Sequence, residues 1–243
     1  MSLPTGAPPR SYSVLLPPGW QRVPVDDGAR QVLRSILDEA FADVPRDTAA
    51  PFRGELEKAL LAQVDSARRE NGIDLYLPVG GLRGRPIAAS FVVSHLPPPD
   101  GPGDPVELAA EVVAQLAESA PAGEPVADGS AGGDDAGARE RTGGAGQAED
   151  GLAPTELVTV AGMPSVRLDR QEQPQLRPLF GVERPSRRIT YVVPVPGGAG
   201  FVLVAFSTLV SEPSAGPDGA PEPLLSDALV TLFDAVMTTF RWR

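Results

Sequence analysis

The stretch that decides the fold is Arg188-Ile-Thr-Tyr-Val-Val-Pro-Val-Pro-Gly-Gly-Ala-Gly-Phe-Val-Leu-Val-Ala-Phe-Ser-Thr-Leu-Val210, close to the end of the chain. It is the densest apolar run in the sequence, and a Pro/Gly segment divides it into two halves. Side chains of a strand alternate between two faces, and here both faces are apolar or small. The two halves are therefore expected to be neighbouring strands of a sheet that helices cover on both sides.

Apolar residues at helical spacing predict the covering helices. Residues 32–44 and 51–71 each carry one apolar stripe, and the closing segment 225–240 carries a third. Another helix is expected from Asp104 onward, because this acid, a proline and a glutamate follow one another in the form of a capping box. We assign the N-terminal pair to one face of the sheet and the C-terminal helix to the other.

Shorter runs with a period of two predict the remaining strands. Within 73–77 the aliphatic residues alternate with Asp74 and Tyr76, which predicts one buried and one solvent-exposed face. The same exposed-face interpretation is given to Asp169. The other expected strands are 11–16, 21–25, 86–96, 156–161 and 165–170. Together these elements predict an α+β fold with a central, mainly antiparallel sheet flanked by helices on both faces.

Residues 119–153 differ in composition from the rest of the chain. They are rich in Gly and Ala, and their seven acids and two arginines carry five of the eleven net negative charges. Such a segment buries too little apolar area to offset its ordering entropy, so a disordered acidic insertion is expected. The predicted organisation is a flexible N-terminus over 1–10 and a single domain over 11–243, interrupted by this insertion.

Composition also limits which classes of partner and which cellular compartment are expected. The net charge of -11 argues against binding to a nucleic-acid backbone. The sequence has no cysteine, which excludes disulfides and thiolate metal sites. No window has the roughly 18 to 20 apolar residues of a membrane span, and the N-terminus has no signal-peptide pattern. We therefore expect a cytoplasmic location, no nucleic-acid partner and no membrane span.

Motifs for catalysis or cofactor binding are weak. His95 is the chain's one histidine, so two-histidine metal motifs are excluded, and its place at a strand end favours a packed or hydrogen-bonded structural role. The glycine-rich segments 80–84 and 197–200 lead into strands, whereas phosphate-binding loops lead into a helix. We predict no catalytic, cofactor-binding or metal-binding residues.

One basic cluster lies within 175–188. As a solvated loop it requires no function, but it could also contact an acidic partner, including the chain's own acidic insertion. The residues of this candidate interaction loop are Arg177, Phe180, Arg184, Arg187 and Arg188.

Four short patterns resemble the PsbP-like superfamily, which includes the LpqN-like proteins of GC-rich bacteria. They are Pro18-Gly-Trp20, Val160-Ala-Gly-Met-Pro-Ser-Val-Arg167, the hairpin between Tyr191 and Phe206, and Phe233-Asp-Ala-Val-Met-Thr-Thr-Phe-Arg-Trp242. The resemblance implies an antiparallel sheet flanked by helices and a binding or assembly role. It implies no catalytic residues. The chain departs from the secreted members because it has no lipidated cysteine.

The expected function is a non-enzymatic adaptor or accessory protein-interaction domain, linked to a secretion or assembly system and to an unknown protein partner. The alternative is a small-molecule-binding protein or enzyme that uses a pocket on the sheet face, with Tyr76, Tyr191, Trp20 or His95 among its polar groups. Homodimerisation through the sheet edge or the terminal helix is a third alternative.

Overall fold

The centre of the protein is a seven-stranded antiparallel sheet with the strand order β2-β3-β4-β8-β7-β6-β5. The structure, a computed structural model, describes residues 11–42, 45–79, 87–98, 105–118, 155–172, 185–210 and 225–243. The strands of this sheet are β2 (Trp20–Pro24), β3 (Gly72–Pro78), β4 (Ala89–Leu96), β5 (Thr155–Val160), β6 (Met163–Glu172), β7 (Ser186–Pro194) and β8 (Phe201–Leu209). The stretch that the sequence placed at the centre forms β7 and β8, which pair with each other.

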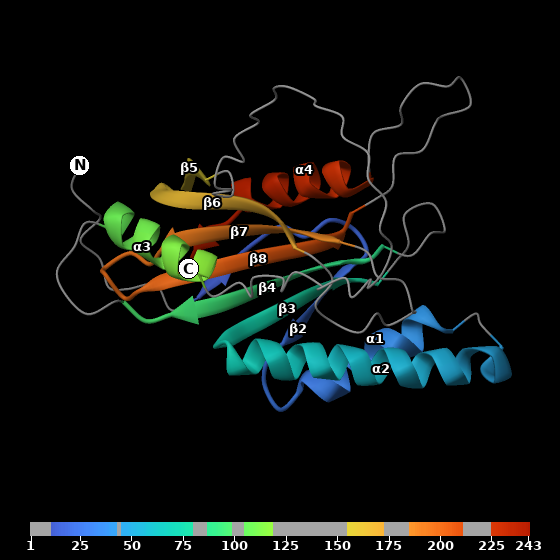
Figure 1. The fold of residues 1–243 in the computed structure, drawn as a ribbon. Helices are drawn as coiled ribbons and strands as arrows, with labels where there is room; N and C mark the ends of the chain where they lie inside the picture. The colour runs from blue at the N-terminus through green and yellow to red at the C-terminus, as the bar shows by residue number, and fades with distance from the viewer. Residues whose placement is uncertain are drawn as a thin grey trace, which may run out of the picture.

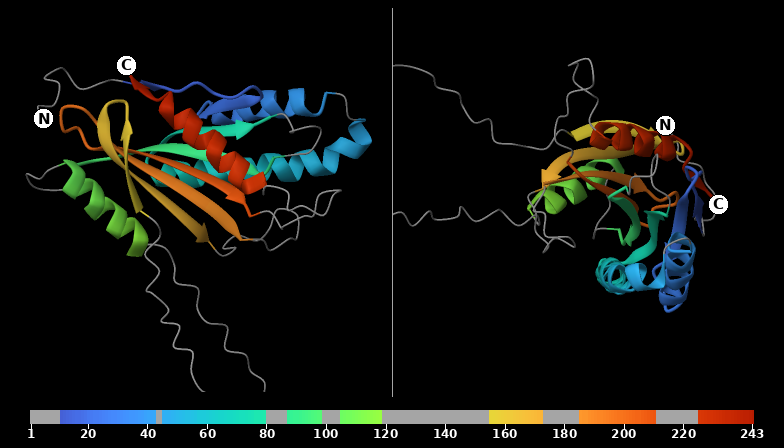
Figure 2. Two further views of the ribbon diagram at one scale, coloured as in Figure 1. Left: turned by 90° about the horizontal axis from the view of Figure 1, so that it is seen from above. Right: turned by 90° about the vertical axis from the view of Figure 1, so that its right-hand side faces the viewer.

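Helices cover both faces of this sheet (Figure 1, Figure 2). One face carries α4 (Leu225–Thr238), and the other carries α3 (Pro105–Glu118) together with α1 (Ala29–Ala40) and α2 (Arg46–Arg69). The predicted α+β class is confirmed, as is the assignment of the N-terminal helices and the C-terminal helix to opposite faces. None of the helices in the described part of the chain is long and apolar enough to cross a membrane.

Side chains along β7 and β8 point to alternate faces of the sheet, so these strands contribute to two separate hydrophobic cores. On β8, Val202, Val204 and Phe206 point toward α4, whereas Leu203 packs with α3. Phe233 of α4 stands at the centre of the first core: its ring stacks on Phe206 at a centroid distance of 4.8 Å and also contacts Phe91 and Tyr191. A third core joins α1 and α2 to β2 and β3.

The two ends of the described chain pair with each other. β1 (Tyr12–Ser13) and β9 (Arg241–Trp242) form a separate two-stranded antiparallel sheet. The ring of Tyr12 stacks on Phe240 at a centroid distance of 5.4 Å. The β1–β9 pair positions Tyr12 beside β3, where its hydroxyl group belongs to one of the polar clusters described below.

Some element boundaries differ from the sequence predictions. α2 begins at Arg46, five residues before Pro51, because the intervening alanines favour a helix and a proline near its start removes only one intrahelical hydrogen bond. β6 includes Pro164, which the sequence placed in a turn. The predictions for 1–10 and 119–153 concern residues outside the described ranges.

Candidate functional site

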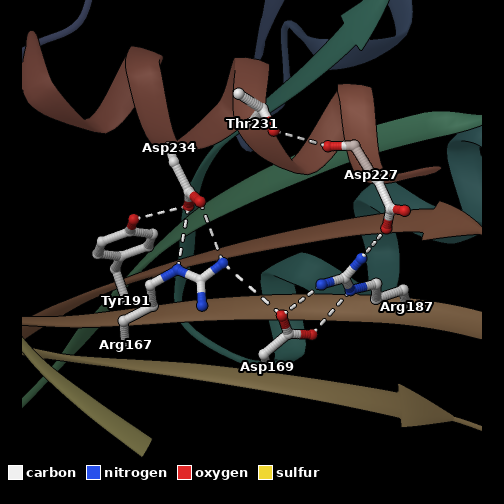
Figure 3. A network of polar contacts seen from close by, with 7 residues as sticks. All are labelled: Arg167, Asp169, Arg187, Tyr191, Asp227, Thr231 and Asp234. Atoms are coloured by element: carbon white, nitrogen blue, oxygen red, sulfur yellow. Dashed lines mark hydrogen bonds and ion pairs between the residues drawn. The ribbon is translucent and has the colours of Figure 1, made fainter. Parts of the chain in front are cut away.

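A chain of alternating charges joins α4 to the face of the sheet beneath it (Figure 3). We call it the Arg–Asp ladder. In order, its members are Asp227, Arg187, Asp169, Arg167 and Asp234, with Tyr191 at its end.

Regular spacing in three elements produces the ladder. Arg167 and Asp169 are two residues apart on β6, so both side chains point to the α4 face of the sheet. On β7, Arg187 and Tyr191 are four residues apart and share that same face. Asp227 and the acid seven residues after it on α4 lie two helical turns apart and point toward the strands.

The strongest contacts of the ladder are bidentate ion pairs between an arginine and an aspartate. The guanidinium of Arg187 donates to both oxygens of Asp169 at 2.9 and 2.7 Å. The guanidinium of Arg167 donates to both oxygens of Asp234 at 3.1 Å each, and the Tyr191 hydroxyl donates to the same carboxylate at 2.7 Å. Such bidentate, charge-assisted pairs fix geometry as well as supplying energy. The ladder therefore sets the position of α4 on β6 and β7.

A second polar cluster lies where the chain ends meet β3. Tyr12 donates its hydroxyl hydrogen to Asp74, and Arg22 donates from Nε to the other carboxylate oxygen at 2.7 Å. The hydroxyls of Tyr12 and Tyr76 are 3.0 Å apart. Because the hydrogen of Tyr12 is already directed at Asp74, Tyr76 must be the donor in this pair. We call these four residues the Asp74 cluster.

Both clusters hold their tyrosines in the protonated form. Burial raises the pKa of Tyr12, and the neighbouring Tyr76 and the hydrogen bond to Asp74 raise it further. Burial likewise raises the pKa of Tyr76 and of Tyr191. The Arg187 guanidinium stays charged, since its hydrogen bond to Asp169 raises its pKa.

The chemistry available to these clusters is hydrogen bonding between groups that already satisfy one another. Arg22 and the ladder arginines neutralise the carboxylates, and the raised tyrosine pKa values disfavour phenolate nucleophiles. No group of three metal-ligating side chains occurs within the described ranges. The arrangement supports a structural role, in which buried polar groups specify how the terminal strands and α4 dock.

The predicted interaction loop is only partly within the described residues. Arg177, Phe180 and Arg184 lie outside the described ranges. Arg187 and Arg188 belong to β7 and not to a loop, because this strand starts at Ser186. Arg187 is held by the ladder, and Arg188 lies 3.6 Å from Glu172 across the strand pair.

The four side chains expected around a pocket point elsewhere. Tyr76 and Tyr191 are buried in the two polar clusters, and Trp20 packs against Phe91 at a centroid distance of 5.6 Å. His95 is exposed at the end of β4, with Nε2 3.0 Å from the carbonyl oxygen of Ala199, which confirms the predicted hydrogen-bonded role. None of the four lines the depression described next.

A shallow depression of about 420 Å³, largely open to solvent, lies along α2. Its described lining is one stretch of that helix and mixes small, aliphatic and charged side chains: Gly54, Glu57, Lys58, Leu61, Ala62 and Asp65. The helix is fixed to α1 by ion pairs, among them Arg34 to Glu57 at 2.9 Å. The adjacent face of α2 is the packed one, where Val64 is buried in the core shared with α1 and the sheet. The depression therefore lies at the border of this core: Leu61 in its lining packs against the core, whereas Ala62 and Asp65 are exposed.

No protein-family model matches the chain, and no curated protein matches it by sequence. Among solved structures, the crystal structure of LpqN, involved in cell envelope biogenesis of Mycobacterium tuberculosis, is similar. The similarity covers 98% of this chain and 86% of that chain, with a TM-score of 0.38 and 11% sequence identity.

The sequence interpretation missed the two acids that organise the polar clusters. Asp74 was expected on an exposed face but is only 1% exposed, and the Asp169 side chain, beneath α4, is only 15% exposed. The prediction was wrong because β3 and β6 are covered on both faces, so their polar positions point into packed layers. A signal was present for Asp169: Arg167 and Asp169 alternate in register on a strand whose neighbour carries Arg187.

Proposed function

We propose that the chain is a non-enzymatic adaptor or accessory protein-interaction domain of the PsbP-like superfamily, and that it binds its partner through the outer surface of α2. The observation that carries this proposal is the open depression along α2, whose lining includes the exposed residues Lys58, Ala62 and Asp65. Phe52, near the start of the same helix but outside this lining stripe, is 59% exposed. Exposed aromatic and aliphatic side chains beside charged ones are typical of protein interfaces.

Helix α2 is suited to this role because it is well anchored. Besides the apolar core, Arg53 pairs with Asp38 at 2.5 Å and Arg68 with Asp27 at 3.3 Å. A rigid helix presents its surface without a large ordering cost on binding. Glu57 is already paired with Arg34, whereas Lys58 and Asp65 are exposed beside the depression, so the proposed partner segment places an apolar side chain against Leu61 and carries charges of both signs around it.

The proposed biological setting is a secretion or assembly system, with the chain in the cytoplasm. The motivation is the sequence resemblance together with an interaction surface on a scaffold whose polar clusters are internally paired. Fractionation of cells that express the full chain tests the location. Recovery with the membrane or envelope fraction would contradict it.

The binding surface is tested by affinity capture from the native host with two matched variants. Ala62→Arg places a bulky cation in the depression, whereas Ala114→Arg makes the same change on the exposed side of α3. A partner that co-purifies with the wild type should be lost with Ala62→Arg and kept with Ala114→Arg. If no protein co-purifies above background with the wild type, the adaptor proposal fails; if both variants keep the partner, α2 is not the surface.

A further inference from the structure

The strand β5 forms one edge of the sheet, and Glu156 is the one charged residue that protects this edge. In the strand order β5 has β6 as its neighbour on one side and no described strand on the other (Figure 1). Its six residues, Thr-Glu-Leu-Val-Thr-Val, include no proline and no lysine, and its register with β6 is continuous. By contrast, the opposite edge strand β2 contains Arg22 and ends at Pro24. Edges with so little protection are templates for pairing with another strand.

The turn between β5 and β6 fixes which backbone groups of β5 point outward. Ala161 and Gly162 both have positive φ, at 49° and 79°, as a two-residue type I′ hairpin turn requires. In such a hairpin the residues that flank the turn, Val160 and Met163, form a hydrogen-bonded pair, and hydrogen-bonded pairs then alternate along the ladder. The N–H and C=O groups of Leu157 and Thr159 therefore point away from β6.

This alternation of hydrogen-bonded and non-hydrogen-bonded pairs also explains why β6 accommodates Pro164. It lies opposite Thr159, in a pair that is not hydrogen-bonded, so the missing N–H of the proline costs no bond to β5. The agreement between the turn geometry and the position of the proline supports the assignment of the outward-facing groups.

The outward-facing residues have a self-complementary order. Leu157 is 65% exposed and lies midway between Thr155 and Thr159, on the face that also carries α3. In an antiparallel pair with a second copy, centred on Leu157, this leucine meets its own counterpart and Thr159 lies opposite Thr155 of the second copy. Glu156 then lies opposite Val158, so the two glutamates do not face each other directly. Apolar cross-strand pairs are favourable, and like charges directly opposite are not. Thr155 already makes another interaction, so the pairing rests on Leu157 and not on the threonines.

We propose that the chain forms a two-fold symmetric homodimer in which two β5 strands pair antiparallel about Leu157, joining the two sheets into one. Leu157 of each copy exchanges backbone hydrogen bonds with Leu157 of the other, and the two side chains cover each other. Such an isologous interface is closed, because each copy uses its one β5 edge. The net charge of -11 per chain opposes association, so the dimer strengthens as salt screens this repulsion.

The first test is disulfide trapping, for which this chain is suited because it has no cysteine. Residues opposite each other in a hydrogen-bonded antiparallel pair have Cα atoms about 5.5 Å apart, within the range of about 4.4 to 6.8 Å that a disulfide needs. The Leu157→Cys variant of the full chain should form a covalent dimer under mild oxidation. The matched control is Leu232→Cys, an exposed leucine on α4, which should remain monomeric.

The second test measures the wild-type association constant by sedimentation equilibrium at two salt concentrations. Thr159→Pro removes an outward N–H without breaking a bond to β6, and Leu157→Lys adds a charge to the edge; each should weaken the dimer about tenfold or more. Thr159→Val keeps the N–H and should leave the dimer intact. A circular dichroism spectrum and melting curve for each variant show whether it is folded.

Three results would overturn the proposal. One is a wild type that sediments as a monomer up to its solubility limit. Another is a dimer that folded Thr159→Pro and Leu157→Lys variants leave unchanged. The third is equal oxidation of the two cysteine variants. If the chain is monomeric and a photo-crosslinker at position 157 captures a different protein, the edge pairs with that protein and not with a second copy. None of these results bears on the α2 surface, which lies on another element.

Discussion

Each of the chain's three tyrosines sits in one of the two polar clusters. Tyr12 and Tyr191 each donate a hydrogen bond to a carboxylate, and Tyr76 donates to Tyr12. Burial raises the pKa of all three hydroxyls above their ordinary value of 10.0. The native state therefore binds these protons more tightly than the unfolded chain does, and stability becomes dependent on pH in alkaline solution.

The first prediction concerns that alkaline limit. Below pH 10 the tyrosines are protonated in both states, and their contribution to stability is fully present. Above it, the unfolded chain releases protons that the native state retains, so the free energy of unfolding falls by up to about 1.4 kcal/mol per pH unit for each tyrosine. Urea titrations at increasing pH measure this slope.

Phenolate absorbance provides a control for the same prediction. All three tyrosines should ionise together with unfolding, and not before it, in a native-state titration. Tyr191→Phe removes one titrating group and should reduce the slope of stability against pH. A native protein that gains phenolate absorbance while its circular dichroism stays unchanged would contradict the assigned burial.

The second prediction concerns Gly200, which closes the turn between β7 and β8. Its φ is +103°, and a Cβ atom there would collide with the carbonyl oxygen of Leu96. Gly200→Ala should therefore lower the free energy of unfolding by about 3 kcal/mol or more. Gly198 is the matched control: its φ is also positive, at +75°, but no atom lies within 4 Å of a Cβ placed there. Gly198→Ala should cost about 1 kcal/mol. Equal losses for the two variants in urea denaturation would show that the Leu96 contact is unimportant.

The sequence predicted the burial and contacts of individual side chains less well than it predicted the helices and strands. Asp74 and Asp169 have the same alternation as exposed strand residues. Nothing in the spacing distinguishes Asp74 from such residues, and for Asp169 the one signal is its position beside Arg167 on a strand whose neighbour carries Arg187. Their burial depends on which helix or terminal strand lies above them, and that is a property of the assembled fold. The hydrogen bond of His95 was easier to predict because a lone histidine at a strand end has carbonyl groups nearby.

At the scale of elements, α4 depends on both its apolar face and the Arg–Asp ladder. Phe233, Val236 and Met237 are buried against the sheet, as the sequence period predicted. The polar side of the contact falls on Asp227 and Asp234, which lie two turns apart on the helix. These two acids differ in their surroundings, and that difference allows their contributions to be compared.

The third prediction is that the contacts of Asp234 contribute more to the free energy of unfolding than those of Asp227 do. The Asp234 side chain is 36% exposed and accepts hydrogen bonds from Arg167 and Tyr191, whereas Asp227 is 55% exposed and accepts one from Arg187. Asp234→Ala leaves both donors without this partner and should lower the free energy of unfolding by about 2 kcal/mol. Asp227→Ala, an exposed pair, should cost under about 1 kcal/mol. Urea denaturation in low and high salt measures both; a larger loss for Asp227→Ala would reverse the ranking.

Elements with a strong period were predicted well, and those defined by distant partners were not. The paired strands β7 and β8 and the helix α4 followed from alternation and helical spacing. β9 has two residues and becomes a strand only because β1 lies beside it, although the two are at opposite ends of the sequence. No local pattern encodes such a pairing. The start of α2 was misplaced because proline was given more weight than the alanines before it.

At the scale of the whole molecule, the two proposed surfaces belong to opposite ends of the sheet. α2 packs with β2 and β3 at one edge, and β5 forms the other edge. A dimer joined through β5 would therefore leave both α2 surfaces available. Two binding surfaces on one rigid assembly increase apparent affinity for a partner that is itself repeated, without any new contact.

The described sheet joins parts of the chain on either side of residues 119–153. β4, before this segment, pairs along eight residues with β8, after it, and the core beneath α4 includes Phe91 from one side and Phe233 from the other. The sequence prediction that 119–153 is disordered concerns residues outside the described ranges and stays a prediction. It can be tested through the two arginines in the segment.

The fourth prediction is that trypsin first cleaves the native chain after Arg139 or Arg141, because a disordered segment fits a protease active site without local unfolding. The two fragments should then remain one folded particle, since the strand pair β4–β8 and the α4 core join them without the covalent link. Mass spectrometry locates the cuts, and gel filtration of the cleaved sample should show a single peak with the wild-type circular dichroism spectrum. First cuts inside the described elements would contradict the predicted disorder. Separation of the fragments would instead show that the intervening segment is needed to hold the two halves of the sheet together.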